Sequence, residues 1–222
     1  MATFHTVKVQ EVIQETADAV SVLFDIPQNL KERFSFKAGQ YITLKKEIKG
    51  EEVRRAYSIC SSPESNEVKV AIKAVENGLF STYATSTLKK DEAIEISEPE
   101  GLFVLEPSSN KRYIGFAAGS GITPVLSMVK TVLEAEETST FTLVYGNKSI
   151  ADTIFFKVLN NLKETYLERF NLHFIYSREQ VKNGLRGRID ASVTNYFVKN
   201  MYKETSFDAA FLCGPEEMIK AV

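Results

Sequence analysis

Hydrophobic and polar residues alternate with two different periods along this chain of 222 residues. Up to about residue 105 the apolar residues form short runs between turn signals, and in residues 67–75, EVKVAIKAV, every second side chain is apolar. A period of two is typical of a half-buried β-strand. Similar runs predict strands at 6–14, 19–26, 41–46, 53–59 and 93–97. This spacing indicates a small antiparallel barrel, interrupted by one helix at about 80–88.

The second half of the chain has a longer period. Strand-like runs at 112–118, 141–147, 172–177 and 208–214 alternate with segments in which apolar residues recur at helical spacing, at 125–133, 154–162 and 193–198. This alternation predicts a parallel sheet with crossover helices. The polar stretch EPSSNK, residues 106–111, is the natural linker. We therefore expect two domains, residues 1–107 and residues 108–222.

A glycine-rich loop joins the first strand of the second half to its first helix, in the stretch GFAAGSGITPV. Gly119 and Gly121 allow a sharp turn and close approach of a ligand, and the free amides of a helix start attract phosphate. Thr123 is the expected N-cap and Pro124 the expected first helical residue. A proline replaces the third glycine of the GxGxxG fingerprint, so the loop indicates a different kind of nucleotide site. A loop that binds nothing is the alternative.

Two further clusters carry chemistry in the first half. In RRAYSICSSP, residues 54–63, Arg55 can clamp a pyrophosphate and Tyr57 can stack on a flat ring. In NGLFSTYA, residues 77–84, Gly78, Ser81 and Thr82 stand at a helix start that suits a second phosphate. Taken singly, Tyr57 also fits a strand aromatic, Arg55 a surface charge, and the helix start an ordinary one. Together, two phosphate-suited helix starts suggest two nucleotides.

Charge and cysteine content exclude several classes of protein. The formal net charge of −2 gives no reason to expect nucleic acid binding. The two cysteines, Cys60 and Cys213, are too far apart in sequence to form a CxxC metal site, and we expect no metal. The N-terminus lacks the apolar core of a signal peptide, and no run of about 18 apolar residues could span a membrane. These features favour a reducing cytoplasmic setting, and His5 and His173 are expected to be structural.

Three motifs in order, Arg55-Ala56-Tyr57-Ser58 with Ser61, GSGITP and CGPEEM, resemble those of the ferredoxin-NADP reductase superfamily. Within it, the chain is most similar to the reductase components of phenylacetyl-CoA oxygenases, through YGN at 145–147, YSRE at 176–179 and GRID at 187–190. The resemblance covers essentially the whole chain. It implies a six-stranded antiparallel Greek-key FAD-binding barrel followed by a parallel α/β NADP-binding domain.

The resemblance also implies roles for individual residues. Arg55 would meet the flavin pyrophosphate, Tyr57 would pack on the isoalloxazine, and Ser58 would hydrogen-bond near flavin N5 as a catalytic residue. Cys213, also expected to be catalytic, would lie beside the nicotinamide, at the carboxyl edge of the sheet. Gly121 and Thr123 would lie where the two cofactors meet. The other residues expected to bind cofactor are Ala56, Ala71, Ile72, Lys73, Gly78, Phe80, Ser81, Thr82, Gly119, Asn147, Ser177, Arg178 and Gly214.

Cofactor choice is inferred from Ser177 and Arg178. A hydroxyl and a guanidinium at a strand end can hold a 2′-phosphate, which favours NADPH over NADH. The expected reaction is hydride transfer from NADPH to FAD, followed by single-electron transfer. In the resembling reductases the electrons pass to a plant-type [2Fe-2S] domain and then to an oxygenase that epoxidises phenylacetyl-CoA. The cysteines of such a cluster are absent from this sequence, and the uncapped end at Val222 suggests truncation.

Three alternatives remain at this point. In the first, the chain would be a stand-alone ferredoxin or flavodoxin reductase or the reductase module of a flavohaemoglobin, none of which needs an iron-sulfur cluster in the same domain. In the second, it would be a non-catalytic subunit that keeps FAD and has lost pyridine nucleotide binding. In the third, it would be a structural domain in which the glycine loops are only turns.

Overall fold

The computed structural model describes residues 3–181 and 184–222. Contacts between its residues divide the chain into two compact units. Unit 1 comprises the residues up to Glu106 together with Leu126–Thr131, and unit 2 comprises Pro107–Val125 and Val132–Val222.

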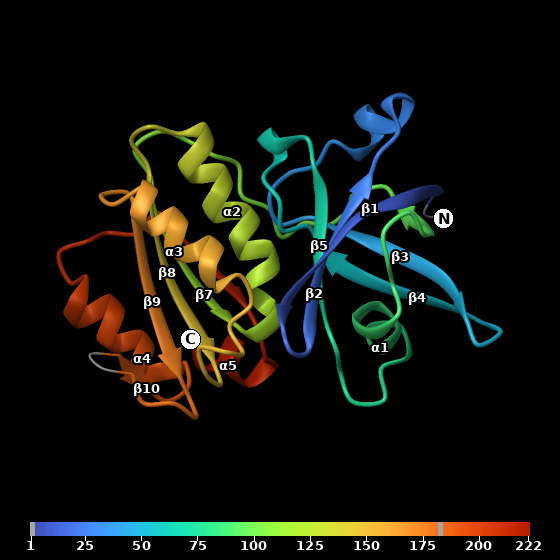
Figure 1. Ribbon diagram of the computed structural model, residues 1–222. Helices are drawn as coiled ribbons and strands as arrows, with labels where there is room; N and C mark the ends of the chain where they lie inside the picture. The colour runs from blue at the N-terminus through green and yellow to red at the C-terminus, as the bar shows by residue number, and fades with distance from the viewer. Residues whose placement is uncertain (1–2, 182–183) are drawn as a thin grey trace. The chain divides into compact units, whose positions relative to one another are not determined.

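The described part of unit 1 is built on a six-stranded antiparallel sheet (Figure 1). Its strands are β1 (Phe4–Thr16), β2 (Ala19–Asp25), β3 (Tyr41–Ile48), β4 (Glu51–Ser58), β5 (Val68–Lys73) and β6 (Ala93–Ser97). They lie in the order β4-β3-β6-β1-β2-β5. Beyond the end of β4, Ile59 bridges Val70, and the Cys60 amide donates to the Lys69 carbonyl at 2.8 Å. The two outer strands therefore meet, and the sheet curls into a barrel, as the alternating pattern predicts.

Alternation of side chains explains the core of this barrel. Every second residue of β5 points inward, so that Val68, Val70 and Ile72 are buried in one cluster with residues of the other strands. Helix α1 (Leu79–Ser86) contributes Phe80 and Ala84 to the same cluster. Unit 1 also contains two 3₁₀ turns, η1 (Gln28–Phe34) and η2 (Pro63–Ser65).

The described part of unit 2 is a five-stranded parallel sheet with helices. Its strands are β7 (Arg112–Ala118), β8 (Thr140–Asn147), β9 (Phe170–Tyr176), β10 (Leu185–Arg186) and β11 (Ala209–Cys213), in the order β10-β9-β8-β7-β11. Its helical segments are η3 (Gly119–Gly121), the two ends of α2 (Ile122–Ala135), α3 (Phe156–Thr165), α4 (Ala191–Asn195), the π-helical η4 (Tyr196–Met201) and α5 (Glu216–Ala221). The middle of α2, Leu126–Thr131, belongs to unit 1. The expected fold class, an antiparallel barrel followed by a parallel α/β unit, is confirmed.

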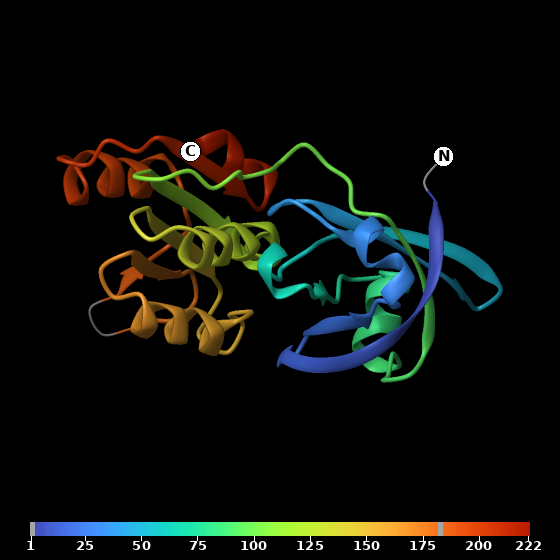
Figure 2. The same cartoon turned by 90° about the horizontal axis from the view of Figure 1, so that it is seen from above.

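Helices cover both faces of the parallel sheet. Seen from above, α2 and α3 lie on one side of the strands, and α4 and α5 lie on the other (Figure 2). Coverage on both faces explains the nearly unbroken apolar sequence of β8, in which Phe141–Gly146 are buried. The strand order reverses at β7, which lies between β8 and β11. Open α/β sheets bind ligands outside the carboxyl ends of the strands at such a switch point.

Some elements differ from the sequence prediction. The third helix, expected at 193–198, begins at Ala191 and continues as the π-helical η4 to Met201. The two-residue strand β10 carries no periodic signal, so the sequence pattern does not predict it.

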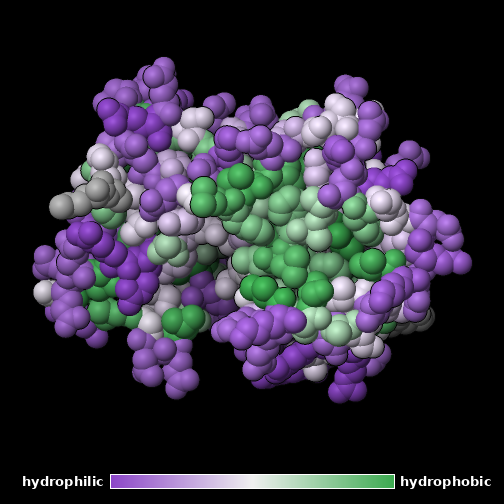
Figure 3. Space-filling model, turned by 180° about the vertical axis from the view of Figure 1, so that it is seen from behind, coloured by the Kyte–Doolittle hydropathy of each residue, from purple (hydrophilic) through white to green (hydrophobic). Residues whose placement is uncertain are grey.

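The edge strand β11 keeps Ala209, Phe211 and Leu212 only half-buried. Hydrophobic surface is exposed on the face of the molecule seen from behind (Figure 3). Within the described residues, no helix has both the length and the apolar character required to cross a membrane.

Candidate functional site

The end of β4, strand β5 and the start of α1 come together in unit 1. Ser58, the last residue of β4, lies opposite Tyr41 of β3, and the next residue, Ile59, bridges β5. The ring of Tyr57 lies 5.7 Å from that of Phe80 on α1, at an interplanar angle of 39°. The fold thus brings the RAYS and NGLFSTYA motifs, some twenty residues apart in sequence, to one place.

Tyr57 is half-buried beside charged and polar neighbours. Burial raises its pKa to about 12, and the Arg55 charge offsets this effect only in part. The phenol is therefore neutral near pH 7. Arg55 and Ala56 are exposed, and Ser58 is half-buried. The Arg55 guanidinium donates to the Arg54 carbonyl at 2.6 Å, which leaves further donors on this planar group for a ligand.

The start of α1 is compact and has no side-chain cap. The Gly78 position leaves no room for a side chain, because a Cβ there would lie 2.3 Å from Ser81 Oγ and 2.5 Å from Val75 Cγ2. Ser81 is buried, and its hydroxyl accepts from the Val75 amide at 3.2 Å and donates to the Gly78 carbonyl at 3.3 Å. Thr82 is exposed. The first-turn amides therefore stand at a tight, glycine-lined bend, which suits an anionic ligand.

Strand β5 contains three of the residues expected to bind cofactor, Ala71, Ile72 and Lys73, and they differ in exposure. Ile72 is fully buried in the barrel core, so a ligand at this position would contact its backbone and not its side chain. Ala71 is also buried, at 5% exposure. The Lys73 ammonium lies 3.4 Å from an Asp18 carboxylate oxygen. Of the three side chains, Lys73 has the most contact with solvent.

A second cluster lies at the carboxyl edge of the parallel sheet in unit 2. A Cβ on Gly121 would lie 2.2 Å from the Cys213 carbonyl oxygen and 2.8 Å from the Gly214 nitrogen. A Cβ on Gly214 would lie 3.2 Å from Ala118. Only glycine permits this approach of the loop after β7 to the end of β11. The GSGITP and CGP motifs, more than ninety residues apart, therefore form one site.

The helix start at this loop differs from the sequence prediction. Helical turns begin already at Gly119, whose φ of +55° suits glycine, and α2 follows directly from Ile122. Thr123 therefore lies inside the helix and is not its N-cap, and Pro124 is the third residue of α2. The Thr123 hydroxyl donates back to the Ser120 carbonyl at 3.0 Å. Helical structure therefore begins about one turn before the predicted N-cap, Thr123. The Thr-Pro pair alone does not show this earlier start.

The ends of β8 and β9 contribute the remaining expected residues. The Ser177 amide donates to the Asn147 carbonyl at 2.9 Å, and the Arg178 amide donates to the Lys148 carbonyl at 2.9 Å. The side-chain Nδ2 of Asn147 is buried and finds no hydrogen-bond partner among the described residues. A buried donor of this kind is costly unless something accepts from it. Asn147, Ser177 and Arg178 thus share one edge of the sheet.

Sequence reasoning missed one structural member of this site. Tyr145 is fully buried in β8, and its hydroxyl donates to the Gly119 carbonyl at 3.0 Å. This bond ties the glycine loop to the neighbouring strand. A tyrosine inside an otherwise apolar buried strand is a signal that its hydroxyl has a partner.

Cys213 is a protonated thiol in this setting, because burial raises its pKa. It is thus suited to packing beside a ligand and poorly suited to nucleophilic attack. Among residues 3–181 and 184–222, no group of three or more His, Cys, Asp or Glu residues is placed to hold a metal ion.

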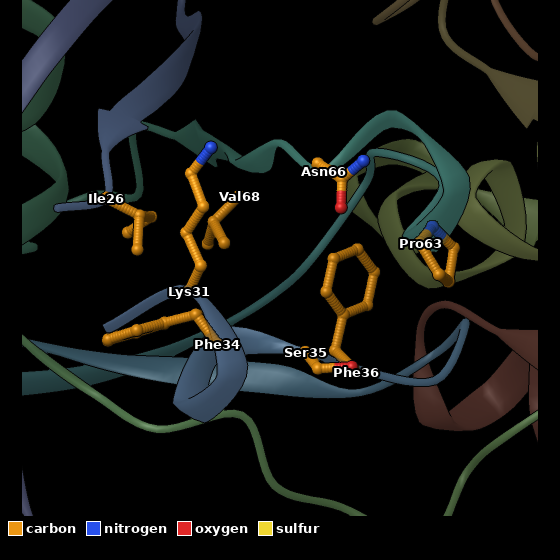
Figure 4. Close-up of a pocket in the computed structure, with 8 residues that line it drawn as sticks. All are labelled: Ile26, Lys31, Phe34, Ser35, Phe36, Pro63, Asn66 and Val68. Atoms are coloured by element: carbon orange, nitrogen blue, oxygen red, sulfur yellow. The ribbon is translucent and has the colours of Figure 1, made fainter. Parts of the chain in front are cut away.

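A separate pocket in unit 1 contains none of the expected site residues (Figure 4). It has about 400 Å³ of empty space, partly open to solvent. Its lining consists of Ile26, Lys31, Phe34, Ser35, Phe36, Pro63, Asn66 and Val68. In Figure 4 the Lys31 side chain extends between Ile26 and Val68.

Comparison with known proteins assigns both halves of the chain. Residues 6–105 match the oxidoreductase FAD-binding domain, and residues 116–222 match the oxidoreductase NAD-binding domain. A ferredoxin NADP+ reductase from Neisseria gonorrhoeae, solved with bound FAD and NADP, superposes with a TM-score of 0.83. It shares 21% identity, and the match covers 100% of this chain and 89% of that one.

Two curated relatives match nearly the whole chain. One subunit of the 1,2-phenylacetyl-CoA epoxidase of Escherichia coli (strain K12) is 41% identical over 222 residues, 99% of this chain and 62% of the relative. The flavodoxin/ferredoxin–NADP reductase of the same strain is 29% identical over 226 residues, 99% of this chain and 88% of the relative. The chain spans about three fifths of the length of the first of these.

The antiparallel barrel matches the FAD-binding domain, and the parallel α/β unit matches the NAD-binding domain. This combination defines an NAD(P)H-dependent flavin oxidoreductase. The chain belongs to the FAD- and NAD-binding oxidoreductases, and its fold is that of the ferredoxin-NADP reductases. Its cofactors are FAD and NAD(P)H, and the expected enzyme class is confirmed.

The residues present fit both cofactors. On the barrel, the uncapped start of α1 and the exposed Arg55 supply donors for a pyrophosphate. On the parallel sheet, open space surrounds the Gly119 position at the start of the glycine loop, and the buried Nδ2 of Asn147 lacks an acceptor among the described residues. A nucleotide would supply such an acceptor.

Proposed function

We propose that this chain is the reductase of a multicomponent oxygenase and delivers electrons from NADPH, through an iron-sulfur centre, to an oxygenase such as phenylacetyl-CoA epoxidase. The observation that carries this proposal is the 41% identity over 222 residues with the epoxidase subunit of E. coli. Residues 1–107 would be the FAD-binding domain and residues 108–222 the NADP-binding domain. Cys60 and Cys213 are free thiols, which supports a cytoplasmic location.

On the barrel, Arg55, the amides of Phe80 and Ser81 and the hydroxyl of the exposed Thr82 bind the pyrophosphate in this proposal, and Tyr57 packs on the flavin ring. The Thr82 amide itself donates to the Gly78 carbonyl at 3.0 Å. The Ser58 hydroxyl donates a hydrogen bond at flavin N5. Bound FAD supplies the chemistry that couples a two-electron donor to one-electron acceptors. The protein orients the ring and excludes water from one of its faces.

On the parallel sheet, the loop with Gly119 and Gly121, together with Cys213-Gly214, holds the nicotinamide half in this proposal. Thr123 fixes this loop through its bond to the Ser120 carbonyl. Asn147, Ser177 and Arg178 hold the adenosine half, and Arg178 pairs with the 2′-phosphate that distinguishes NADPH from NADH.

Reduction by the two pyridine nucleotides tests the proposal. The purified, FAD-loaded protein should lose its flavin absorbance on anaerobic mixing with NADPH, and the rate with NADH should be at least about tenfold lower. Arg178→Gln should lower kcat/KM for NADPH about tenfold, the value of one charge-assisted contact, and leave NADH unchanged. Lys8→Gln, on β1, is the charge-matched control. Equal rates with both nucleotides in the unaltered protein would contradict the NADPH assignment.

A second candidate, a stand-alone flavodoxin or ferredoxin reductase, is favoured by the match that covers 88% of the E. coli enzyme. The electron acceptor separates the two. In the presence of O2, NADPH, this chain, a [2Fe-2S] carrier and the oxygenase components of the epoxidase should together convert phenylacetyl-CoA to its epoxide. Rapid reduction of flavodoxin without any epoxidation would support the second candidate.

A further inference from the structure

Helix α1 has little stability of its own. It has only eight residues, LFSTYATS, and short helices are marginal without tertiary contacts. Serine and threonine are poor helix formers, and two of them, Thr85 and Ser86, donate side-chain hydrogen bonds to the carbonyls of Ser81 and Thr82 at 2.9 and 2.6 Å. The position of α1 is therefore decided by what holds it to the barrel.

At its start and middle, α1 is held mainly by apolar packing. Phe80 and Ala84 are buried at 1% exposure in the barrel core. Apolar contacts of this kind are non-directional, so they allow a short helix to rotate or slide by small amounts. A directional contact is needed to fix its angle.

Tyr83 supplies a directional contact at the last turn. Its hydroxyl donates to the Glu92 carboxylate, just before β6. The Lys46 ammonium, on β3, lies 3.0 Å from the same carboxylate oxygen and donates to the Ala93 carbonyl at 2.9 Å. Side chains of Lys46 and Glu92 are only 26% and 21% exposed. Helix α1 and strand β3 therefore converge on one carboxylate.

Glu92 is itself fixed by the backbone. Its carbonyl accepts from the Val9 amide at 2.9 Å, and the neighbouring Asp91 amide donates to the Val9 carbonyl at 2.8 Å. Burial acts to raise the pKa of Glu92, but the hydrogen bonds from Tyr83 and Lys46 outweigh it and hold the pKa below its usual range. The carboxylate is thus ionised near neutral pH, and its bond from Tyr83 is charge-assisted.

The Tyr83 ring also touches the ring of Phe80 edge-on, at 6.0 Å between centroids and 71° between planes. Phe80 in turn packs on Tyr57. A continuous chain of contacts therefore runs from Lys46 and Glu92 through Tyr83 and Phe80 to the tyrosine at the end of β4.

We propose that Tyr83 is a positioning residue for FAD binding: its bond to the Lys46–Glu92 pair sets the angle of α1, which aligns the Phe80 ring with Tyr57 and the first-turn amides with the pyrophosphate. This inference rests on the proposed placement of FAD at β4 and α1. Tyr83 itself acts from the second half of the helix, through Phe80 and the helix backbone.

The test uses Tyr83→Phe, Glu92→Gln and the double variant of the full chain. Apoprotein is titrated with FAD while flavin fluorescence is followed, and the visible circular dichroism of the bound flavin is recorded. Each single variant should bind FAD about tenfold more weakly, the order expected for loss of a charge-assisted hydrogen bond, and should alter the dichroism. Because both residues act through one contact, the double variant should lose no more than about twofold further.

Two matched controls distinguish the positioning of α1 from a general loss of barrel stability. Glu95→Gln removes the ion pair with Lys45 (2.7 Å) on the same pair of strands, β3 and β6, without touching the Tyr83 contact. Tyr196→Phe removes a phenol hydroxyl from η4 in unit 2. Both should bind FAD within about twofold of the unaltered protein, with an unchanged dichroism spectrum.

Each outcome decides the question. The inference would be overturned if Tyr83→Phe and Glu92→Gln bound FAD as tightly as the unaltered protein and gave the same dichroism spectrum. It would also be overturned if the double variant lost FAD affinity by the full product of the two single losses. If Tyr83→Phe fails to fold, Glu92→Gln, which keeps an oxygen acceptor, decides by the same two readouts. Failure of the unaltered protein to bind FAD would refute the proposed function instead.

Discussion

At the scale of single residues, burial shifts the pKa of several titratable groups away from the ordinary value. The Cys60 thiol is fully buried and donates to the Lys69 carbonyl at 3.3 Å, and burial raises its pKa to about 12. His173 is also desolvated: burial first, and then the nearby Lys163 charge, lowers its pKa from 6.5 to about 4. Its Nε2 lies 2.7 Å from the Tyr202 hydroxyl, and its ring lies 4.8 Å from that of Phe197. This histidine is a neutral structural group, as the sequence suggested.

The neutral state of His173 predicts acid sensitivity. The folded pKa lies below the unfolded value, so the unfolded chain binds the extra proton first as the pH falls. The free energy of unfolding should therefore decrease between about pH 6.5 and pH 4. Denaturant titrations at a series of pH values measure the slope. His173→Gln should flatten this part of the profile, whereas His5→Gln should keep it. An unchanged slope in His173→Gln would contradict the assignment.

Gly121 predicts a steric effect at the nucleotide site. In Gly121→Ala the new methyl group would lie 2.2 Å from the Cys213 carbonyl oxygen, and backbone must move to admit it. The free energy of unfolding should fall by about 1–3 kcal/mol, and reduction by NADPH should slow at least about tenfold. Chemical denaturation and stopped-flow absorbance measure the two effects.

Gly119→Asn, in the same loop, is the stability control for this prediction. Position 119 has open space around it and a φ of +55°, which asparagine tolerates better than other residues. Its stability should stay within about 1 kcal/mol of the unaltered protein. A Gly121→Ala protein as stable and as fast as the unaltered one would show that the two loops do not meet so closely.

At the scale of elements, local pattern locates the strands well and helix starts less well. Predicted strands at 19–26 and 93–97 agree closely with β2 and β6, because alternation of buried side chains is written into the sequence itself. The predicted start of α2 is wrong because the turn at Gly119–Gly121 carries no cap of its own. The contact that anchors α1, Tyr83 to Glu92, links two elements and has no local pattern.

The β3–β4 hairpin predicts a stabilising substitution. Its two-residue turn, Lys49-Gly50, has φ angles of +52° and +81°, and the flanking Ile48 pairs with Glu51. Two positive φ angles define a type I′ turn, in which asparagine is favoured before glycine. Lys49→Asn should raise the free energy of unfolding by about 0.5–1 kcal/mol. Urea denaturation checks this, with Lys89→Asn as the matched control, and a decrease would contradict the turn geometry.

At the scale of the whole molecule, the chain has two units with separate sheets, and the FAD-binding and NAD-binding domain models match residues 6–105 and 116–222. Each unit has its own apolar cluster, one inside the barrel and one that includes Ile114, Phe116 and Val144 of the parallel sheet. Each cofactor is therefore expected to stabilise the unit that binds it.

Ligand-linked stability tests where each cofactor binds. FAD at one hundred times its dissociation constant should add about 2.7 kcal/mol to the free energy of unfolding. Hydrogen exchange should slow in β4, β5 and the start of α1 with FAD, and at residues 119–123, 177–178 and 213–214 with NADP+. Adenosine without phosphates serves as the control. Slower exchange confined to other segments would contradict the proposed sites.

The sequence by itself determined the fold class, because its two hydrophobic periods specify an antiparallel barrel followed by a parallel α/β unit. It also contains the motifs that suit two nucleotides. These features are local, because a strand or helix must bury one face wherever it lies in the fold. Only the tertiary structure decided that Gly121 meets Cys213, that the Ile72 side chain is buried in the core and that Tyr83 is held by Glu92. Contacts between distant residues depend on strand register and packing of the whole unit, which no short stretch of sequence encodes.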